Sequence, residues 1–171
     1  MIKDYEECLK GYFDEQFIKN AKALSPTAEI IEAVVDKMGM YTENILEIGT
    51  SKGYSAGYYR FVIPNSMVIT VDVISTIESF KIAEVFKNII VMNATSDSFR
   101  KFYPGFDAIM IDGDHKYYSC LRDYENALRI IKKGGLIFMD NLNHGEQCGR
   151  VFEECELKKE VICGTMGVIY T

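Results

Sequence analysis

The chain has 171 residues, a length that fits one domain over residues 1–171. Hydrophobic residues make up 48% of it and charged residues 26%, as is typical of a globular protein with its own core. The net charge of −6 argues against an extended phosphate-binding surface, and so against nucleic acid as a partner. No apolar run is long enough to span a bilayer, no signal-peptide pattern is present, and the scattered cysteines indicate reduced thiols, so we expect a cytoplasmic protein without membrane contact.

The first part of the chain is predicted to be helical. Apolar side chains recur at helical spacing over residues 4–24. Ser25-Pro26 is typical of a second helix start, with serine as the cap and proline at the first helical position, and an apolar stripe follows as far as Met38. The aromatic residues of the N-terminal segment, residues 1–24, suggest either a lid over a ligand pocket or a contact in a homodimer.

Beyond this segment, short apolar runs alternate with helical patterns. We predict strands over residues 45–48, 67–71, 89–92, 106–111 and 136–139. Helices are predicted over residues 54–63, 77–87 and 117–131, with Gly134-Gly135 ending the last one, and the tail is predicted to form a helix near 146–155 and a hairpin of 160–163 and 166–170. This order indicates an α/β fold with a mostly parallel sheet, helices on both faces and a C-terminal antiparallel hairpin.

Polar side chains occur where each of the five predicted parallel strands ends. They are Glu47, Asp72, Asn93, Asp112, Asp140 and Asn141. The carboxyl ends of parallel strands meet at one edge of the sheet, and ligands bind at that edge. A polar group at the end of every strand therefore predicts a binding site there.

The turn after the first predicted strand carries the most informative motif. Glu47-x-Gly49-x-x-x-Gly53 lies between a strand and a helix and lacks the glycine spacing of the dinucleotide fingerprint. It resembles the first motif of the class I S-adenosylmethionine-dependent methyltransferases, and this resemblance covers nearly the whole chain. It implies a single Rossmann-like, doubly wound domain that binds S-adenosylmethionine. The residues at the family's cofactor-binding positions are Glu47, Gly49, Thr50, Ser51, Gly53, Tyr54, Ser55, Asp72, Val73, Asn93, Ala94 and Asp112.

The resemblance also implies roles for individual residues. An acidic residue at the position of Asp72 hydrogen-bonds the ribose hydroxyls in this family, Glu47 anchors the turn and the ligand's ammonium group, and Asn93-Ala94 borders the adenine. The residues themselves leave structural roles open: Asp72 as a helix cap, Glu47 as a purely structural turn residue, and Asn93 as an ordinary turn asparagine.

A second resemblance rests on residues 111–118 and 134–141. These segments are similar to a bacterial subgroup of small-molecule O-methyltransferases that is related to the catechol, caffeoyl-coenzyme A and macrolide-sugar enzymes. The resemblance implies a divalent cation held by Asp112, Asp140 and Asn141. Their hard oxygen donors suit Mg²⁺.

In the sugar-modifying relatives, a histidine three residues past the first metal ligand serves as the base, and His115 has this position. With Asp112 it forms the predicted catalytic pair, since a histidine can take a proton near neutral pH. His144, in the loop after the fifth strand, is a rival base. Asp112 could instead be a turn residue, and Asp114 could cap the helix that follows.

The two resemblances imply S-adenosylmethionine-dependent, magnesium-assisted methyl transfer to a hydroxyl of a small acceptor, either a sugar or a phenolic natural product. Two alternatives remain at this point. One is a metal-independent N- or O-methyltransferase, and the other is a nucleotide-binding module without catalysis.

Overall fold

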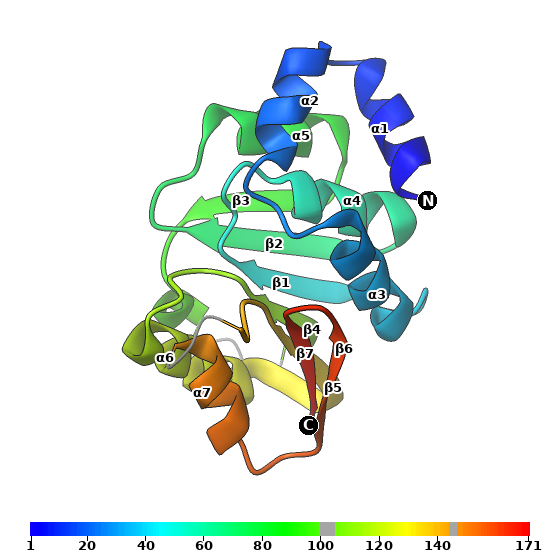
Figure 1. Ribbon diagram of the computed structural model, residues 1–171. Coiled ribbons are helices and arrows are strands. Elements are labelled where there is room, and N and C mark those ends of the chain that lie inside the picture. The colour runs from blue at the N-terminus through cyan, green and yellow to red at the C-terminus, as the bar shows by residue number, and fades with distance from the viewer. Residues whose placement is uncertain (100–104, 144–146) are drawn as a thin grey trace.

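The computed structural model describes residues 1–99, 105–143 and 147–171. Its centre is a seven-stranded sheet with the order β3-β2-β1-β4-β5-β7-β6 (Figure 1). The strands are β1 (Asn44–Ile48), β2 (Met67–Asp72), β3 (Ile89–Asn93), β4 (Phe106–Ile111), β5 (Ile131–Met139), β6 (Lys159–Cys163) and β7 (Met166–Tyr170). The first five strands pair in parallel, whereas β7 runs antiparallel to both β5 and β6. The predicted sheet with its C-terminal hairpin is confirmed.

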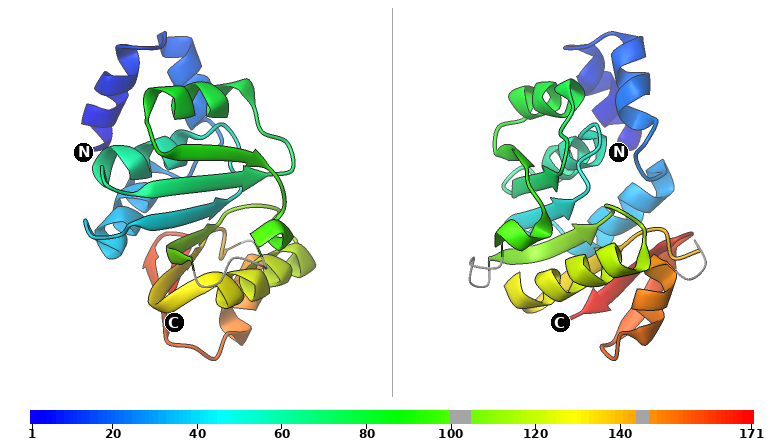
Figure 2. Two further views of the ribbon diagram at one scale, coloured as in Figure 1. Left: turned by 180° about the vertical axis from the view of Figure 1, so that it is seen from behind. Right: turned by 90° about the vertical axis from the view of Figure 1, so that its left-hand side faces the viewer.

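Helices cover both faces of the sheet. They are α1 (Ile2–Lys10), α2 (Glu15–Lys22), α3 (Ala28–Met38), α4 (Tyr54–Val62), α5 (Ile77–Val85), α6 (Tyr117–Ile130), α7 (Cys148–Glu154) and the 3₁₀ helix η1 (Ser96–Phe99). Helices α1 to α5 contribute to the apolar core on one face, and η1, α6 and α7 to the core on the other (Figure 2). No helix of the described residues is both long and apolar enough to cross a membrane.

The N-terminal segment differs from the prediction in its details. It forms two helices in place of one helical stretch over residues 4–24, because Asp14 accepts a hydrogen bond from the Phe17 backbone N–H at 2.7 Å and so starts α2 as its N-cap. Helix α3 has Thr27 as its N-cap, so the start predicted at Ser25-Pro26 is wrong and lies too early.

The junction of α6 and β5 corrects a second prediction. Helix α6 ends at Ile130, and Gly134-Gly135 lies inside β5 instead of ending the helix. The pairing of β4 with β5 is irregular there, because Phe106 pairs with Ile131 and the next pair joins Ala108 to Leu136. The extra residues of β5 form a bulge, and a φ of 82° at Gly134 fits such a position.

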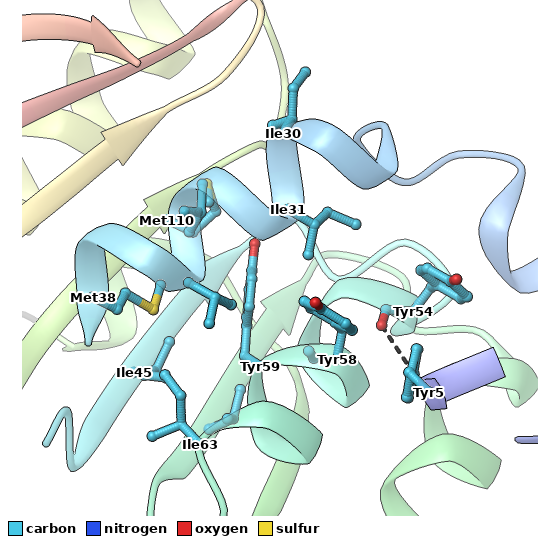
Figure 3. Close-up of a cluster of buried hydrophobic side chains, with 14 of the residues drawn as sticks. Tyr5, Ile30, Ile31, Met38, Ile45, Tyr54, Tyr58, Tyr59, Ile63 and Met110 are labelled. Carbon is cyan, nitrogen blue, oxygen red and sulfur yellow. Dashed lines mark hydrogen bonds between the residues drawn. The ribbon is translucent and has the colours of Figure 1, made fainter. Parts of the chain in front are cut away.

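Tyrosines form much of the core beneath α3 and α4 (Figure 3). Tyr5, Tyr54, Tyr58 and Tyr59 are each 2% exposed or less. The Tyr5 hydroxyl donates a hydrogen bond to the Tyr54 backbone carbonyl at 3.0 Å. This contact joins α1 to the first turn of α4, the helix that begins at the Gly49–Gly53 turn.

The carboxyl ends of the parallel strands are joined by backbone hydrogen bonds. The N–H groups of Gly49, Asp112 and Asp140 each donate to a carbonyl near the end of the neighbouring strand, at 2.8, 2.8 and 3.1 Å. Asp72 and Asn93 are register partners at the ends of β2 and β3. The polar residues predicted to meet at one edge of the sheet are therefore brought together.

Candidate active site

A cavity of about 740 Å³ lies at this edge, within the size range of small-molecule sites. Its wall includes the turn between β1 and α4, the ends of β2 and β4, the segment after β3 and the start of α6. All of the predicted cofactor-binding residues line it except Glu47 and Asn93. The structure thus gathers most of the predicted set around one space.

The N-terminal segment supplies another part of the wall. Ala21 and Leu24, together with the following Ser25, line the cavity. Helical periodicity could not single these residues out, because they lie at the end of α2 and in the loop after it. Their position supports a lid role for residues 1–24, and the homodimer contact stays a prediction.

The two glycines of the β1–α4 turn have positive φ angles, 107° at Gly49 and 77° at Gly53. A Cβ atom at Gly49 would lie 2.0 Å from the Asp112 carbonyl oxygen, and one at Gly53 would lie 2.9 Å from the Cα of Ser79. Glycine is favoured in a turn of this kind because a side chain would block a ligand that approaches the backbone. The structure adds a different reason, since the backbones of the β4 end and of α5 already occupy the space that a side chain would need.

Glu47 lies beneath the cavity and is 1% exposed. Its two carboxylate oxygens accept hydrogen bonds from Ser55 Oγ at 2.5 Å and Thr70 Oγ1 at 2.6 Å. Burial raises its pKa to about 7, against the lowering effect of these two hydroxyl groups. Glu47 therefore joins β1, β2 and α4, and a role toward the ligand stays a prediction.

Asp72 faces the cavity and holds the turn above it. Its Oδ2 accepts a hydrogen bond from the Ser51 backbone N–H at 3.0 Å, whereas Thr76 provides the N-cap of α5. Asp72 is therefore not the cap of that helix. Asn93 accepts a hydrogen bond from the Ser75 backbone N–H at 2.7 Å and does not line the cavity, which gives it the role of an ordinary turn asparagine.

A polar network that the sequence analysis missed lies at the η1 end of the cavity. The Ser96 hydroxyl donates to Asp123 Oδ1 at 2.6 Å, and Asn126 Nδ2 donates to Ser96 Oγ at 2.8 Å and to Asp97 Oδ1 at 2.9 Å. Burial raises the pKa of Asp123 above its usual value. Asp123 lies one helical turn after Ser119, and both line the cavity, so the polar face of α6 was the available signal.

His115 and Asp112 form a pair in the cavity wall, with 3.4 Å between His115 Nε2 and Asp112 Oδ1. The contact with Asp112 raises the pKa of His115, while burial raises that of Asp112 to about 6. His115 and Gly113 also line a second, smaller cavity of about 380 Å³ that Lys116 and Gln147 share. The predicted base thus lies where two cavities meet.

Asp114 has a structural contact next to this pair. Its carboxylate accepts a hydrogen bond from Ser119 Oγ at 2.9 Å and a longer one from the Lys116 backbone N–H at 3.4 Å. These bonds fix the entry to α6, but Lys116 is the N-cap of that helix and no side chain caps it, so the prediction that Asp114 caps α6 is wrong. The rival base His144 lies outside the described residues.

The predicted metal ligands are only partly free. Asp140 Oδ1 accepts hydrogen bonds from Thr165 Oγ1 and from the Asn141 backbone N–H, each at 2.7 Å. Asn141 has a φ of 62°, and its Oδ1 is buried without a hydrogen-bond partner in residues 1–99, 105–143 and 147–171. Among the described residues, no three histidine, cysteine, aspartate or glutamate side chains are grouped closely enough to hold a metal ion. A metal site here would therefore need the Asn141 amide oxygen beside the two carboxylates.

Comparison with solved structures places this fold among known enzymes. An O-methyltransferase from Bacillus cereus in complex with SAH (S-adenosylhomocysteine) has 18% identity and a TM-score of 0.71, over 92% of this chain and 90% of that one. The precorrin-6y C5,15-methyltransferase from Geobacter metallireducens has 13% identity and a TM-score of 0.73, over 93% and 97%. The O-methyltransferase TomG of tomaymycin synthesis from Streptomyces achromogenes, in complex with SAM (S-adenosylmethionine), has 17% identity and a TM-score of 0.66, over 93% and 91%.

These identities are low, so the likeness shows the fold, and it spans two enzymes named as O-methyltransferases and one named for methylation of precorrin-6y. No curated protein sequence matches the chain. The family model described as a methyltransferase domain matches residues 46–142, more than half of the chain, and this match includes the turn after β1, Asp72 and the His115–Asp112 pair. The chain therefore belongs to the methyltransferase domain family and is a methyltransferase with the class I, S-adenosylmethionine-dependent fold.

Proposed function

We propose that this protein transfers a methyl group from S-adenosylmethionine to a hydroxyl of a small acceptor, with His115 as the base. The observation that carries this proposal is the His115–Asp112 pair in the wall of the large cavity, at the opening to a second one. Two adjoining spaces with a proton acceptor between them suit a donor and an acceptor that must meet.

The residues of the large cavity fit S-adenosylmethionine. Asp72 offers carboxylate oxygens at the wall, and a carboxylate can accept hydrogen bonds from both hydroxyls of a ribose. The N-terminal turn of α4, capped by Gly53 without any side-chain hydrogen bond, presents backbone N–H groups to the same space. When bound, S-adenosylmethionine supplies a methyl group on a positively charged sulfur.

His115 and Asp112 would handle the proton of the acceptor. Asp112 Oδ1 is 3.4 Å from Nε2, so we assign the proton of the neutral ring to Nε2 and its lone pair to Nδ1. His115 then takes the hydroxyl proton through Nδ1, and Asp112 stabilises the imidazolium that forms. The raised pKa of His115 makes it a stronger base than a free histidine.

The rim residues also fit a divalent cation, which we include in the proposal. Asn141 Oδ1 is a buried acceptor without a partner, and Asp112 and Asp140 are close enough for the charge of Asp140 to raise the pKa of Asp112. Mg²⁺ accepts such a set of oxygen donors. A cation bound there would lower the pKa of an acceptor hydroxyl.

One observation favours a second candidate, transfer without metal. Asp140 Oδ1 is already engaged by Thr165 and by the Asn141 N–H, so Asp140 could serve only to hold the β6–β7 hairpin against β5. In that case His115 and the positioning of the acceptor would suffice, and nitrogen acceptors would also be compatible with the site.

The first experiment is calorimetric titration of the purified protein with S-adenosylmethionine, for the wild type and for Asp72→Ala. We expect micromolar binding that weakens at least tenfold in the variant, since the bonds to a charged acceptor are lost. Catechol, caffeate and nucleotide sugars are then tested as acceptors by the release of S-adenosylhomocysteine. Absence of cofactor binding by the folded wild-type protein would contradict the proposal.

The metal is tested with the acceptor that the screen identifies. Chelator and Asp140→Ala should each lower the rate strongly if a cation is used, and added Mg²⁺ should restore only the chelated wild type. Thr165→Val is the matched control, because it removes a hydrogen bond from Asp140 but no metal ligand. Full activity of the wild type in chelator would establish the metal-free alternative.

A further inference from the structure

We propose that Asp123 binds the exocyclic amine of the cofactor's purine and thereby selects adenine over 6-oxopurines. This inference rests on the proposed binding of S-adenosylmethionine. Asp123 is in the second turn of α6, outside the motifs from which the cofactor site was predicted. Its assignment comes from its contacts in the cavity wall.

The wall is continuous from the ribose position to Asp123. Asp72 marks the ribose position, and the Ala94 backbone N–H donates to the Asp72 carbonyl at 2.9 Å. Ala94 and Ser96 both line the cavity, and the Ser96 hydroxyl reaches Asp123 at 2.6 Å. A purine attached to a ribose at Asp72 would therefore extend along residues 94–96 toward Asp123.

The two oxygens of the Asp123 carboxylate differ, because Oδ1 is engaged by Ser96 and Oδ2 lies next to Gly113 in the cavity wall. Ser96 Oγ accepts from Asn126 Nδ2, so its own proton is directed to Asp123 Oδ1. Oδ2 lies 3.5 Å from the position that a Cβ on Gly113 would take, which places it over the backbone of a residue that lines the cavity. Among the described residues, no donor is found within hydrogen-bond distance of Oδ2.

The guanidinium of Arg122 pairs with Asp97 at 2.7 Å, and Asp97 also accepts from Asn126. The charge of Arg122 acts on Asp123 by lowering its pKa, against the larger effect of burial. An ionised carboxylate only accepts hydrogen bonds, so a ligand group that meets Oδ2 must be a donor. The 6-amino group of adenine is such a donor, whereas the 6-oxo group of hypoxanthine would set an oxygen against an oxygen.

Calorimetric binding of S-adenosylhomocysteine and S-inosylhomocysteine tests the proposal, because the two ligands differ at position 6 of the purine and in its ring protonation. We expect the wild type to prefer the adenosyl ligand at least tenfold. Asp123→Asn keeps an oxygen that can accept the Ser96 hydrogen bond and replaces the other oxygen by an NH₂ donor. The variant should bind the inosyl ligand better, so the preference for the adenosyl ligand should fall at least tenfold.

Asp97→Asn is the control, because it alters the same network without lining the cavity. It should lower the melting temperature and leave the ligand preference unchanged. A wild-type preference below threefold, or an unchanged preference in folded Asp123→Asn, would overturn the assignment of Asp123 while cofactor binding stands. If Asp123→Asn does not fold, the test rests on the wild-type protein alone, through the ratio of its affinities for the adenosyl and inosyl ligands. Failure of the wild type to bind S-adenosylhomocysteine would overturn the proposed function as well.

Discussion

The two halves of the site differ in how completely the protein satisfies its own polar groups. In the β1–β2 half, Glu47 is held by two hydroxyl groups at 2.5 and 2.6 Å, and Asp72 accepts from the Ser51 N–H at 3.0 Å. In the β4–β5 half, His115 and Asp112 are 3.4 Å apart and Asn141 Oδ1 is buried without a partner. The acidic side chains of the first half are therefore hydrogen-bonded within the protein before any ligand binds, whereas the second half has unused hydrogen-bonding capacity.

This difference suggests that the first half positions a ligand and that the second half takes part in the reaction. A preorganised turn can bind one constant ligand in one geometry, since little rearrangement is needed. In the second half burial disfavours the ionised form of Asp112, and the charge of Asp140 adds to this effect. A proton or a cation would relieve both effects, so this half is where reaction conditions should matter most.

The largest effect should come from removing the base in the second half. His115→Gln keeps a hydrogen-bonding side chain but no group that can take a proton near neutral pH. We expect kcat to fall by about 10²–10⁴-fold, the usual contribution of general base catalysis. The affinity for S-adenosylmethionine, measured by calorimetry, should change by less than about threefold, since the first half is untouched. A kcat that stays near the wild-type value would show that positioning alone carries the transfer.

The next effect tests how rigid the first half is. Gly49→Ala adds a Cβ that would lie 2.0 Å from the Asp112 carbonyl oxygen, at a φ of 107°. We expect the free energy of unfolding to fall by about 3 kcal/mol, measured by urea denaturation, because both the strain and the clash must be relieved by moving the β4 end.

Gly39→Ala is the matched control for this substitution. Gly39 also has a positive φ, 75°, but nothing lies within 4 Å of its Cβ position. It should lose only about 1 kcal/mol, from backbone strain alone. If the free energy of unfolding fell equally in the two variants, the contact between the turn and β4 would not contribute to stability.

The smallest of the three effects concerns the pH dependence of stability. The pKa of Glu47 is about 7 in the folded protein and near 4.5 when unfolded, so the folded state binds the proton more tightly. The stability that protonation provides is therefore present below pH 4.5 and lost as the pH rises through 7. Glu47→Gln should remove this loss, and we expect the variant to gain about 2 kcal/mol on the wild type between pH 5 and pH 8. Parallel stability curves from urea titrations would contradict the raised pKa.

Part of this molecule could be predicted from local patterns. Alternating apolar strands and helices predicted the parallel sheet and its hairpin, because the period of the apolar residues reflects which side chains face the core. The family resemblance carried by Glu47, Gly49, Gly53 and Asp72 predicted a cofactor site in the β1–β2 half. These residues belong to one β-α-β unit, so their relative positions are set within a short stretch of chain.

Contacts between distant segments were decided only by the tertiary structure. Ala21 and Leu24 reach the cavity because Tyr5 packs α1 onto α4, and Asp123 reaches it because α6 lies over η1. Gly134-Gly135 became a bulge in β5 because the pairing with β4 extends back to Ile131.

The same holds for the protonation behaviour of the acids. Glu47 and Asp112 are ordinary carboxylates in the sequence, and only burial among other groups raises their pKa values to about 7 and about 6. Periodicity and motif spacing record what each residue does with its near neighbours in the chain. Burial, charge and hydrogen-bond partners depend on which distant segments contact each other in the fold, and local sequence patterns do not specify those contacts.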